Sequence, residues 1–187
     1  MAPALLRTVI LAFWIAWLAY WLSAARGAKA TQWRESMGEQ WAHGSLALAG
    51  TILLAAPRLL PLPRFLPVGV ALPLLGAAVT AVGLELAIAA RRQLAGNWSA
   101  SVEIKENHAL IRTGPYRYVR HPIYSGLLLA AFGTALALGR WQSLLGWALL
   151  LASLLLKSRR EEARLRQTFP DYARYAQETA ALIPFLL

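Results

Sequence analysis

The residues of this chain best suited to chemistry lie close together at positions 112–126, where arginine, histidine and tyrosine side chains alternate with glycine and proline. Pro122 favours the start of a helix, because the first helical position needs no backbone N–H donor. The N–H groups of that first turn carry a partial positive charge, which attracts a carboxylate or a phosphate. Tyr124 follows His121 by three positions, so both side chains can face one site. The alternative is an anchor at a membrane interface, where such residues are common.

Glu161 and Glu162 form a second candidate, because they are adjacent carboxylates in an otherwise basic segment. Such a pair could bind a cationic ligand or one rich in hydroxyl groups. The simpler interpretation is a solvated helix face on which they pair with Lys157, Arg164 or Arg166. The pair alone therefore does not define a site.

Glu85 is a third candidate, since it lies inside a long apolar run. A carboxylate within a membrane-spanning segment is a functional candidate by default. At this depth it could also reach the interface, or pair with Arg91 or Arg92.

The composition argues against a soluble enzyme and against several kinds of site. Of 187 residues, 58% are hydrophobic and 15% are charged, and the mean hydropathy is +0.45. Globular chains are typically about 45–50% apolar and about 25% charged. The absence of cysteine excludes disulfides, thiol nucleophiles and zinc sites built on Cys. The three histidines are far apart and match no metal-ligand spacing, so no metal site is predicted.

Five apolar runs are long enough, or nearly so, to cross a membrane, which takes about 20 residues. We therefore predict an all-α integral membrane protein with five transmembrane helices. Only Gly139 and Arg140 separate the last two runs, which predicts a short helical hairpin. A cleaved signal peptide is the alternative for the first run, but the apolar stretch is too long and the N-terminal region holds a single Arg. The predicted spans are 5–25, 44–60, 66–90, 123–138 and 141–156.

The distribution of basic residues predicts the orientation of these spans. The net charge is +10. Fifteen Lys and Arg residues fall on the side that carries the loops 26–43 and 91–121 and the C-terminal tail, and four fall on the other. Because basic loops stay in the cytoplasm, we predict an outside N-terminus and a cytoplasmic C-terminus, in a bacterial inner membrane. Orientation and anionic lipid headgroups explain the basic excess, so no nucleic-acid partner is predicted.

Two polar segments lie on the predicted cytoplasmic side. In residues 91–121, apolar residues on both sides of Glu106 and Asn107 favour a short hairpin or an extended loop. In the tail, a helix continues out of the membrane over 157–167. A second helix is predicted from Asp171, whose carboxylate can cap it, to Pro184.

The two charged clusters, in this order around a short hairpin, resemble the isoprenylcysteine carboxyl methyltransferase family and its wider group with the membrane phospholipid methyltransferases. The resemblance covers residues 95–187, about half of the chain. Its first part is Asn97-Trp98-Ser99, His108-x-Leu110-Ile-x-x-Gly114-x-Tyr116 and Arg120-His121-Pro122-x-Tyr124-x-Gly126. Its second part is Glu161-Glu162-x-x-Leu165, Phe169, Tyr172-x-x-Tyr175 and Ile183-Pro184-Phe185.

This resemblance implies a single membrane domain over 1–187, with three spans in 1–90 and a catalytic half in 91–187 that holds the hairpin 122–157. It implies S-adenosylmethionine as cofactor, in a pocket made by the cytoplasmic loop, the hairpin end and the C-terminal helices. No glycine-rich loop follows a predicted strand, so no Rossmann-type site competes with it. The implied acceptor-orienting residue is Arg120, and the implied cofactor contacts are Leu110, Thr113, Gly114, Tyr116, His121, Tyr124 and one or both of Glu161 and Glu162.

The implied reaction is methyl transfer to a lipophilic small-molecule or lipidated acceptor that enters from the bilayer, with a carboxylate of isoprenylcysteine type as the first expectation. A carboxylate is already ionised, whereas an amine or a thiol needs a base, for which Glu85 and His108 are the visible candidates. Two alternatives stay open: an amino-lipid N-methyltransferase of phosphatidylethanolamine type, and a non-enzymatic membrane assembly factor or small transporter. A transporter would place polar groups near the bilayer midplane.

Overall fold

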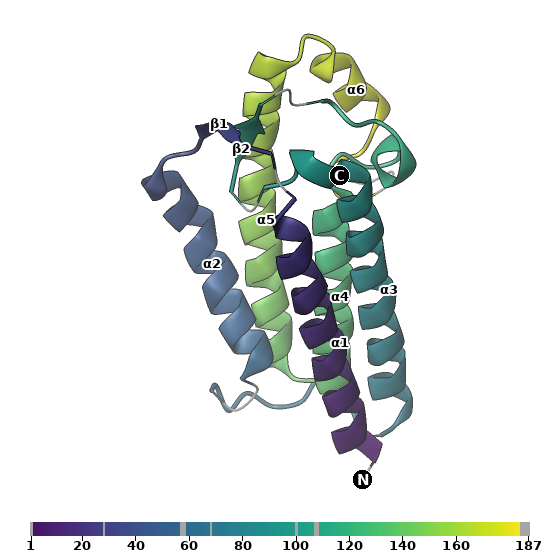
Figure 1. Ribbon diagram of the computed structural model, residues 1–187. Helices are drawn as coiled ribbons and strands as arrows, with labels where there is room; N and C mark the ends of the chain where they lie inside the picture. The colour runs from purple at the N-terminus through teal and green to yellow at the C-terminus, as the bar shows by residue number, and fades with distance from the viewer. Residues whose placement is uncertain are drawn as a thin grey trace.

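A computed structural model describes residues 2–27, 29–56, 59–67, 69–99, 101–106 and 109–183. Within them, five long helices run alongside one another and a sixth short helix caps one end (Figure 1). The helices are α1 (Ala2–Ala25), α2 (Met37–Ala55), α3 (Ala71–Leu94), α4 (Pro122–Leu138), α5 (Trp141–Thr168) and α6 (Tyr172–Glu178). Two short strands, β1 (Thr31–Arg34) and β2 (Glu103–Lys105), and two 3-10 turns, Ala95–Asn97 and Gly114–Arg117, complete the described elements.

The helical membrane architecture predicted from the sequence is confirmed. Three described helices are long and apolar enough to cross a bilayer: Leu5–Ala25, Ala71–Asn97 and Trp141–Thr168. The helix Pro122–Leu138 is apolar but shorter. The α4–α5 hairpin forms as expected, because Gly139 takes the left-handed conformation (φ 61°) that ends α4. The count of five spans stays a prediction.

Several predicted boundaries were wrong for identifiable reasons. The second helix begins at Met37, seven residues early, because Ser36 and Glu39 form a capping box in which Ser36 N–H donates to Glu39 Oε2 over 2.9 Å. The Asp171 side chain makes no capping hydrogen bond with α6, and its carboxylate lies 3.8 Å from Arg112 instead. Helix α6 ends at Glu178, and the proposed stop at Pro184 lies outside the described residues.

The segment of β2 was expected to form a short local hairpin or an extended loop, but it pairs with β1, about seventy positions earlier in the chain. The two strands are antiparallel, with Trp33 opposite Ile104. Glu103 accepts hydrogen bonds from Thr31 Oγ1 (2.7 Å) and from Arg34 Nε (2.6 Å), which supplies charge-assisted pairing to this partner. This two-stranded sheet links the segment after α1 to the segment after α3.

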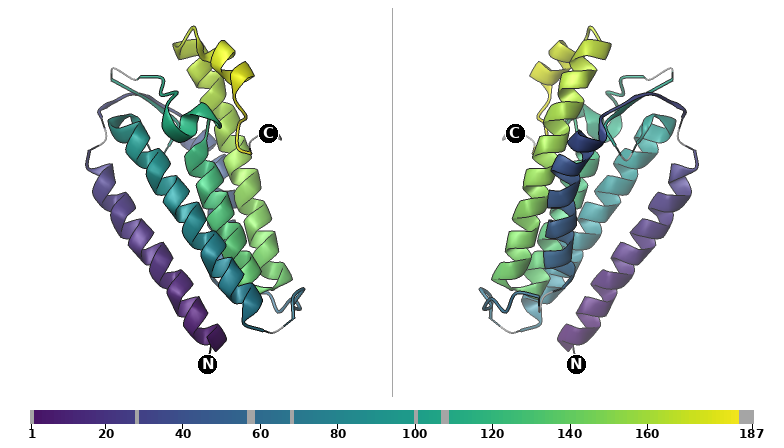
Figure 2. Two further views of the ribbon diagram at one scale, coloured as in Figure 1. Left: turned by 90° about the vertical axis from the view of Figure 1, so that its right-hand side faces the viewer. Right: turned by 90° about the vertical axis from the view of Figure 1, so that its left-hand side faces the viewer.

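Glycines allow the closest helix contacts, a common arrangement in membrane bundles. Helices α3 and α4 meet through Gly83 and Gly126, and helices α2 and α5 meet through Gly50 and Gly146. Helix α1 packs mainly on α3, at the edge of the bundle (Figure 2). Helices α3 and α4 are therefore closely packed against each other.

We expect Gly126→Ala to destabilise the protein, because its new Cβ would lie 2.6 Å from the backbone N of Ala87, which cannot move independently. Overpacking costs about 1–3 kcal/mol, so the melting temperature in detergent should fall by roughly 2–12 °C. Gly44→Ala is the matched control, since no atom lies within 4 Å of its Cβ position. Equal melting temperatures for both variants would contradict this account of the helix contact.

Candidate active site

A pocket lies at one end of the bundle, where α3 ends, α4 begins, and the polar end of α5 meets α6. Residues such as Leu94, Trp98 and Ile123 line its apolar side. The wall also contains polar, ionisable and phenolic side chains: Asn97, Ser99, Glu103, Tyr116, Arg120, His121, Tyr124, Glu161, Tyr172 and Tyr175. Its volume is about 70 Å³, well below the roughly 300–1,000 Å³ of typical ligand sites. A nucleoside-sized ligand would therefore have to displace side chains.

Arg120 and His121 of the pocket wall form a largely buried ionic cluster with Glu162. Arg120 Nε donates to Glu162 Oε1 over 2.8 Å, and His121 Nε2 lies 3.1 Å from the same oxygen. Arg120 Nη1 also donates to the backbone oxygens of Ala176 (2.9 Å) and Thr179. The guanidinium thus holds the end of α6 against the start of α4.

The charge of Glu162 is stabilised by this cluster. The apolar part of α5 ends near Leu156, and Glu162 lies in the polar extension beyond it. Burial by itself raises the pKa of Glu162, but hydrogen bonds from His121 and Arg120, together with their charges, lower it to about 2. Glu162 is therefore ionised at neutral pH and committed to partners within the protein.

Glu161 points differently from its neighbour and lines the pocket. Tyr124 Oη donates to Glu161 Oε2 over 2.8 Å, and His121 Nδ1 lies 3.7 Å from that oxygen. The rings of His121 and Tyr124 stack with centroids 5.3 Å apart, as expected for residues on one face. The Glu161 side chain is 33% exposed, against 14% for Glu162. Of the two carboxylates, Glu161 is the one available to a ligand.

The C-terminal segment covers the start of α4. The backbone N–H groups of Arg120 and His121 donate to Ala180 O (2.8 Å) and Ala181 O (3.0 Å). Ser125 Oγ donates to Leu182 O and to His121 O. These bonds give the first turn of α4 a fixed position relative to α6.

The other residues singled out from the sequence take varied positions. Leu110 and Tyr116 line the pocket. Thr113 and Gly114 lie at the adjoining 3-10 turn, outside the pocket wall, where Thr113 Oγ1 accepts a hydrogen bond from Gln93 Nε2 and Gly114 has a φ of 59°. Glu85 is exposed on α3, nine residues before Leu94, which is about 14 Å along the helix axis. His108 lies outside the described residues.

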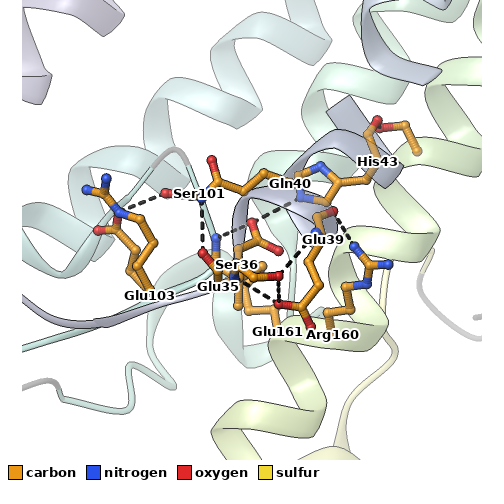
Figure 3. Close-up of polar contacts among 12 residues, drawn as sticks. Glu35, Ser36, Glu39, Gln40, His43, Ser101, Glu103, Arg160 and Glu161 are labelled. Atoms are coloured by element: carbon orange, nitrogen blue, oxygen red, sulfur yellow. Dashed lines mark hydrogen bonds and ion pairs between the residues drawn. The ribbon is translucent and has the colours of Figure 1, made fainter. Parts of the chain in front are cut away.

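A buried polar cluster beside the pocket was not predicted (Figure 3). Glu35 is 4% exposed, and its Oε1 accepts from the backbone N–H of Val102 (3.0 Å) and lies 3.0 Å from His43 Nε2. Glu103 lines the pocket and accepts from Ser101 Oγ over 2.7 Å. No local motif marks these residues, because the paired segments lie 67 or more positions apart.

Fold and site together define an integral membrane protein with a charged, aromatic pocket at the end of its helical bundle. Residues 72–172 match the family model described as phospholipid methyltransferase, and the chain belongs to this family. The family resemblance stated from the sequence is thereby confirmed.

Curated relatives carry related names. A probable protein-S-isoprenylcysteine O-methyltransferase of Oryza sativa subsp. indica is 38% identical over 87 residues, which cover 46% of each chain. The protein-S-isoprenylcysteine O-methyltransferase of Schizosaccharomyces pombe is 36% identical over 111 residues, or 56% of this chain and 46% of that one. The cobalt-zinc-cadmium resistance protein CzcN of Cupriavidus metallidurans is 34% identical over 86 residues, or 44% and 38%. The chain spans about half the length of the curated isoprenylcysteine methyltransferases it matches.

One solved structure is similar over most of the chain. The eukaryotic intramembrane Ras methyltransferase, an isoprenylcysteine carboxyl methyltransferase, superposes with a TM-score of 0.55 at 25% identity. The match covers 81% of this chain and 55% of that protein. The similarity therefore extends beyond residues 91–187 into the N-terminal helices.

Proposed function

We propose that this protein is an S-adenosylmethionine-dependent methyltransferase of the membrane, which methylates a lipophilic acceptor with a carboxylate of isoprenylcysteine type. The observation that carries the proposal is the position of Glu161 in a family-matched pocket where the apolar bundle ends. Five spans, with the N-terminus outside and the pocket in the cytoplasm, belong to the same proposal. The unequal distribution of basic residues supports this orientation. The bacterial inner membrane stays a prediction.

The residues of the pocket fit the proposed cofactor. When bound, S-adenosylmethionine would supply an electrophilic methyl group on a sulfonium. The apolar side, with Leu94 and Trp98, suits a flat adenine ring, and the carboxylate of Glu161 suits a cationic group. The stacked pair of His121 and Tyr124 holds Glu161 in place through the Tyr124 hydroxyl. The proposed role of these residues is to bind the cofactor and to orient it.

Alignment and exclusion of water are the catalytic contributions that this arrangement supports. A carboxylate acceptor needs no general base, so the proposed reaction gives the exposed Glu85 no such role. The guanidinium of Arg120 is engaged with Glu162 and two backbone oxygens. These contacts support a positioning role for Arg120, and its predicted contact with the acceptor stays a prediction.

An apolar groove supports a lipophilic acceptor. It has a volume of about 710 Å³ and is lined by α1, α2, α4 and α5, with Trp14 and Trp17 on its wall. Trp17 stacks on Trp21 at 4.8 Å, and Trp21 meets Trp98 of the polar pocket at 5.3 Å. This column of indole rings connects the groove to the pocket, so a hydrocarbon chain in the bilayer could bring its head group to the site.

A phosphatidylethanolamine-type acceptor is the second candidate. The family description favours it, and the carboxylates of Glu103 and Glu161 in the pocket wall are compatible with an ammonium head group. The described structure favours the enzyme over the transporter alternative, since the pocket with Arg120, His121 and Glu161 lies where α4 begins and not midway along the helices.

The test is transfer of a radioactive methyl group by the purified protein in lipid nanodiscs. We expect S-adenosylmethionine to label a farnesylcysteine analogue as a methyl ester, which releases volatile methanol in base. Phosphatidylethanolamine presented in parallel should stay unlabelled. Base-stable label on phosphatidylethanolamine alone would replace the proposed acceptor by the second candidate, and absence of both donor binding and transfer would overturn the methyltransferase assignment.

A further inference from the structure

The hydroxyl of Tyr172 is buried, and no other described residue pairs with it. This first residue of α6 is 1% exposed and lines the pocket, yet its Oη has no hydrogen-bond partner among the described residues. The neighbouring Tyr175 differs, because its hydroxyl donates to the backbone oxygen of Tyr116 over 2.6 Å. Buried hydroxyls are almost always paired, since an unpaired one has lost its water without compensation. A bound ligand would supply the missing partner.

The surroundings of Tyr172 determine which ligand group it can meet. Burial raises the pKa of the Tyr172 phenol, and the charge of Glu162 raises it further, so the hydroxyl keeps its proton and is a neutral donor. Arg120 acts on the same phenol with the opposite sign. The Tyr172 phenol therefore lies within electrostatic reach of the paired Arg120 and Glu162, which mark the charged part of the pocket surroundings.

The two ends of the pocket suit the two ends of the proposed methyl donor. The adenine ring would take the apolar side, which leaves the zwitterionic amino-acid end for the charged side. Glu161 suits the ammonium group there, and the carboxylate needs a hydrogen-bond donor. We infer that the Tyr172 hydroxyl donates a hydrogen bond to the α-carboxylate of the bound methyl donor, an inference that rests on the proposed function.

Tyr172→Phe removes only the hydroxyl and is the direct test. Binding of S-adenosylmethionine to the detergent-purified protein should weaken about ten- to hundredfold, as expected for loss of a hydrogen bond to a charged group. Decarboxylated S-adenosylmethionine keeps the ammonium and lacks the carboxylate, so its affinity should change less than twofold. The ligand-free variant should melt no lower than the wild type, because the lost hydroxyl had no partner.

Tyr118→Phe is the matched control, since Tyr118 is 65% exposed, and it should bind both ligands as the wild type does. Unchanged affinity of Tyr172→Phe for S-adenosylmethionine would overturn the inference. So would an equal loss for both ligands, or a lower melting temperature of the ligand-free variant, which would indicate a structural role. If the wild type binds neither ligand, the proposed function itself fails.

Discussion

Glu161→Gln is expected to weaken binding of S-adenosylmethionine by about ten- to hundredfold. The carboxylate lines the pocket, is one-third exposed, and is held by the Tyr124 hydroxyl. Glutamine keeps the size of the side chain but removes the charge that a cationic ligand would meet. Hydrogen bonds to charged groups contribute about 1.5–3 kcal/mol, which corresponds to the expected loss.

Isothermal titration calorimetry on the detergent-purified protein measures this effect. Glu178→Gln is the matched control, because Glu178 is 58% exposed and pairs with Arg174 on the surface of α6. We expect the control to bind as the wild type does. If Glu161→Gln and Glu178→Gln bind the donor equally well, Glu161 has no part in the site.

Arg120→Ala is expected to destabilise the protein by about 3–5 kcal/mol, the cost of removing one member of a buried ion pair. The side chains of Arg120 and Glu162 are only 11% and 14% exposed. The substitution leaves the Glu162 carboxylate short of a partner and releases the carbonyls of Ala176 and Thr179. The melting temperature should fall by roughly 6–20 °C.

Thermal unfolding in detergent tests this, with Arg174→Ala as control. Arg174 is 80% exposed, so its pair with Glu178 should contribute little. The pKa of Glu162 falls from 4.5 to about 2 in the folded state, so its stabilisation is present above about pH 4.5 and is lost as the pH falls towards 2. The difference between Arg120→Ala and the wild type should shrink over the same range. Equal melting temperatures of the two arginine variants at pH 7 would show that Arg120 does not hold α6 against α4.

Local sequence signals were sufficient to predict a helical membrane protein and several residues that line the candidate pocket. Long apolar runs predicted the membrane helices, and the Gly139-Arg140 connection predicted the α4–α5 hairpin. A helical hairpin returns the chain to the end from which it started, so Glu161 was expected near His121. In the structure the Tyr124 hydroxyl, on the same helical turn, donates a hydrogen bond to Glu161. Each of these inferences depends on a few neighbouring residues and on the geometry of a helix.

Only the tertiary structure decided how adjacent side chains divide their roles. Glu161 and Glu162 are equivalent in the sequence, yet one lines the pocket and the other pairs with Arg120. Glu85 lies in an apolar run, and the sequence does not show whether its side chain faces the bundle interior or the outside. The packing of α3 leaves it exposed. The pairing of β1 with β2 joins segments some seventy positions apart. The role of each of these side chains depends on which residue from a distant segment lies beside it. The sequence does not specify these neighbours locally, because they meet only when the helices pack.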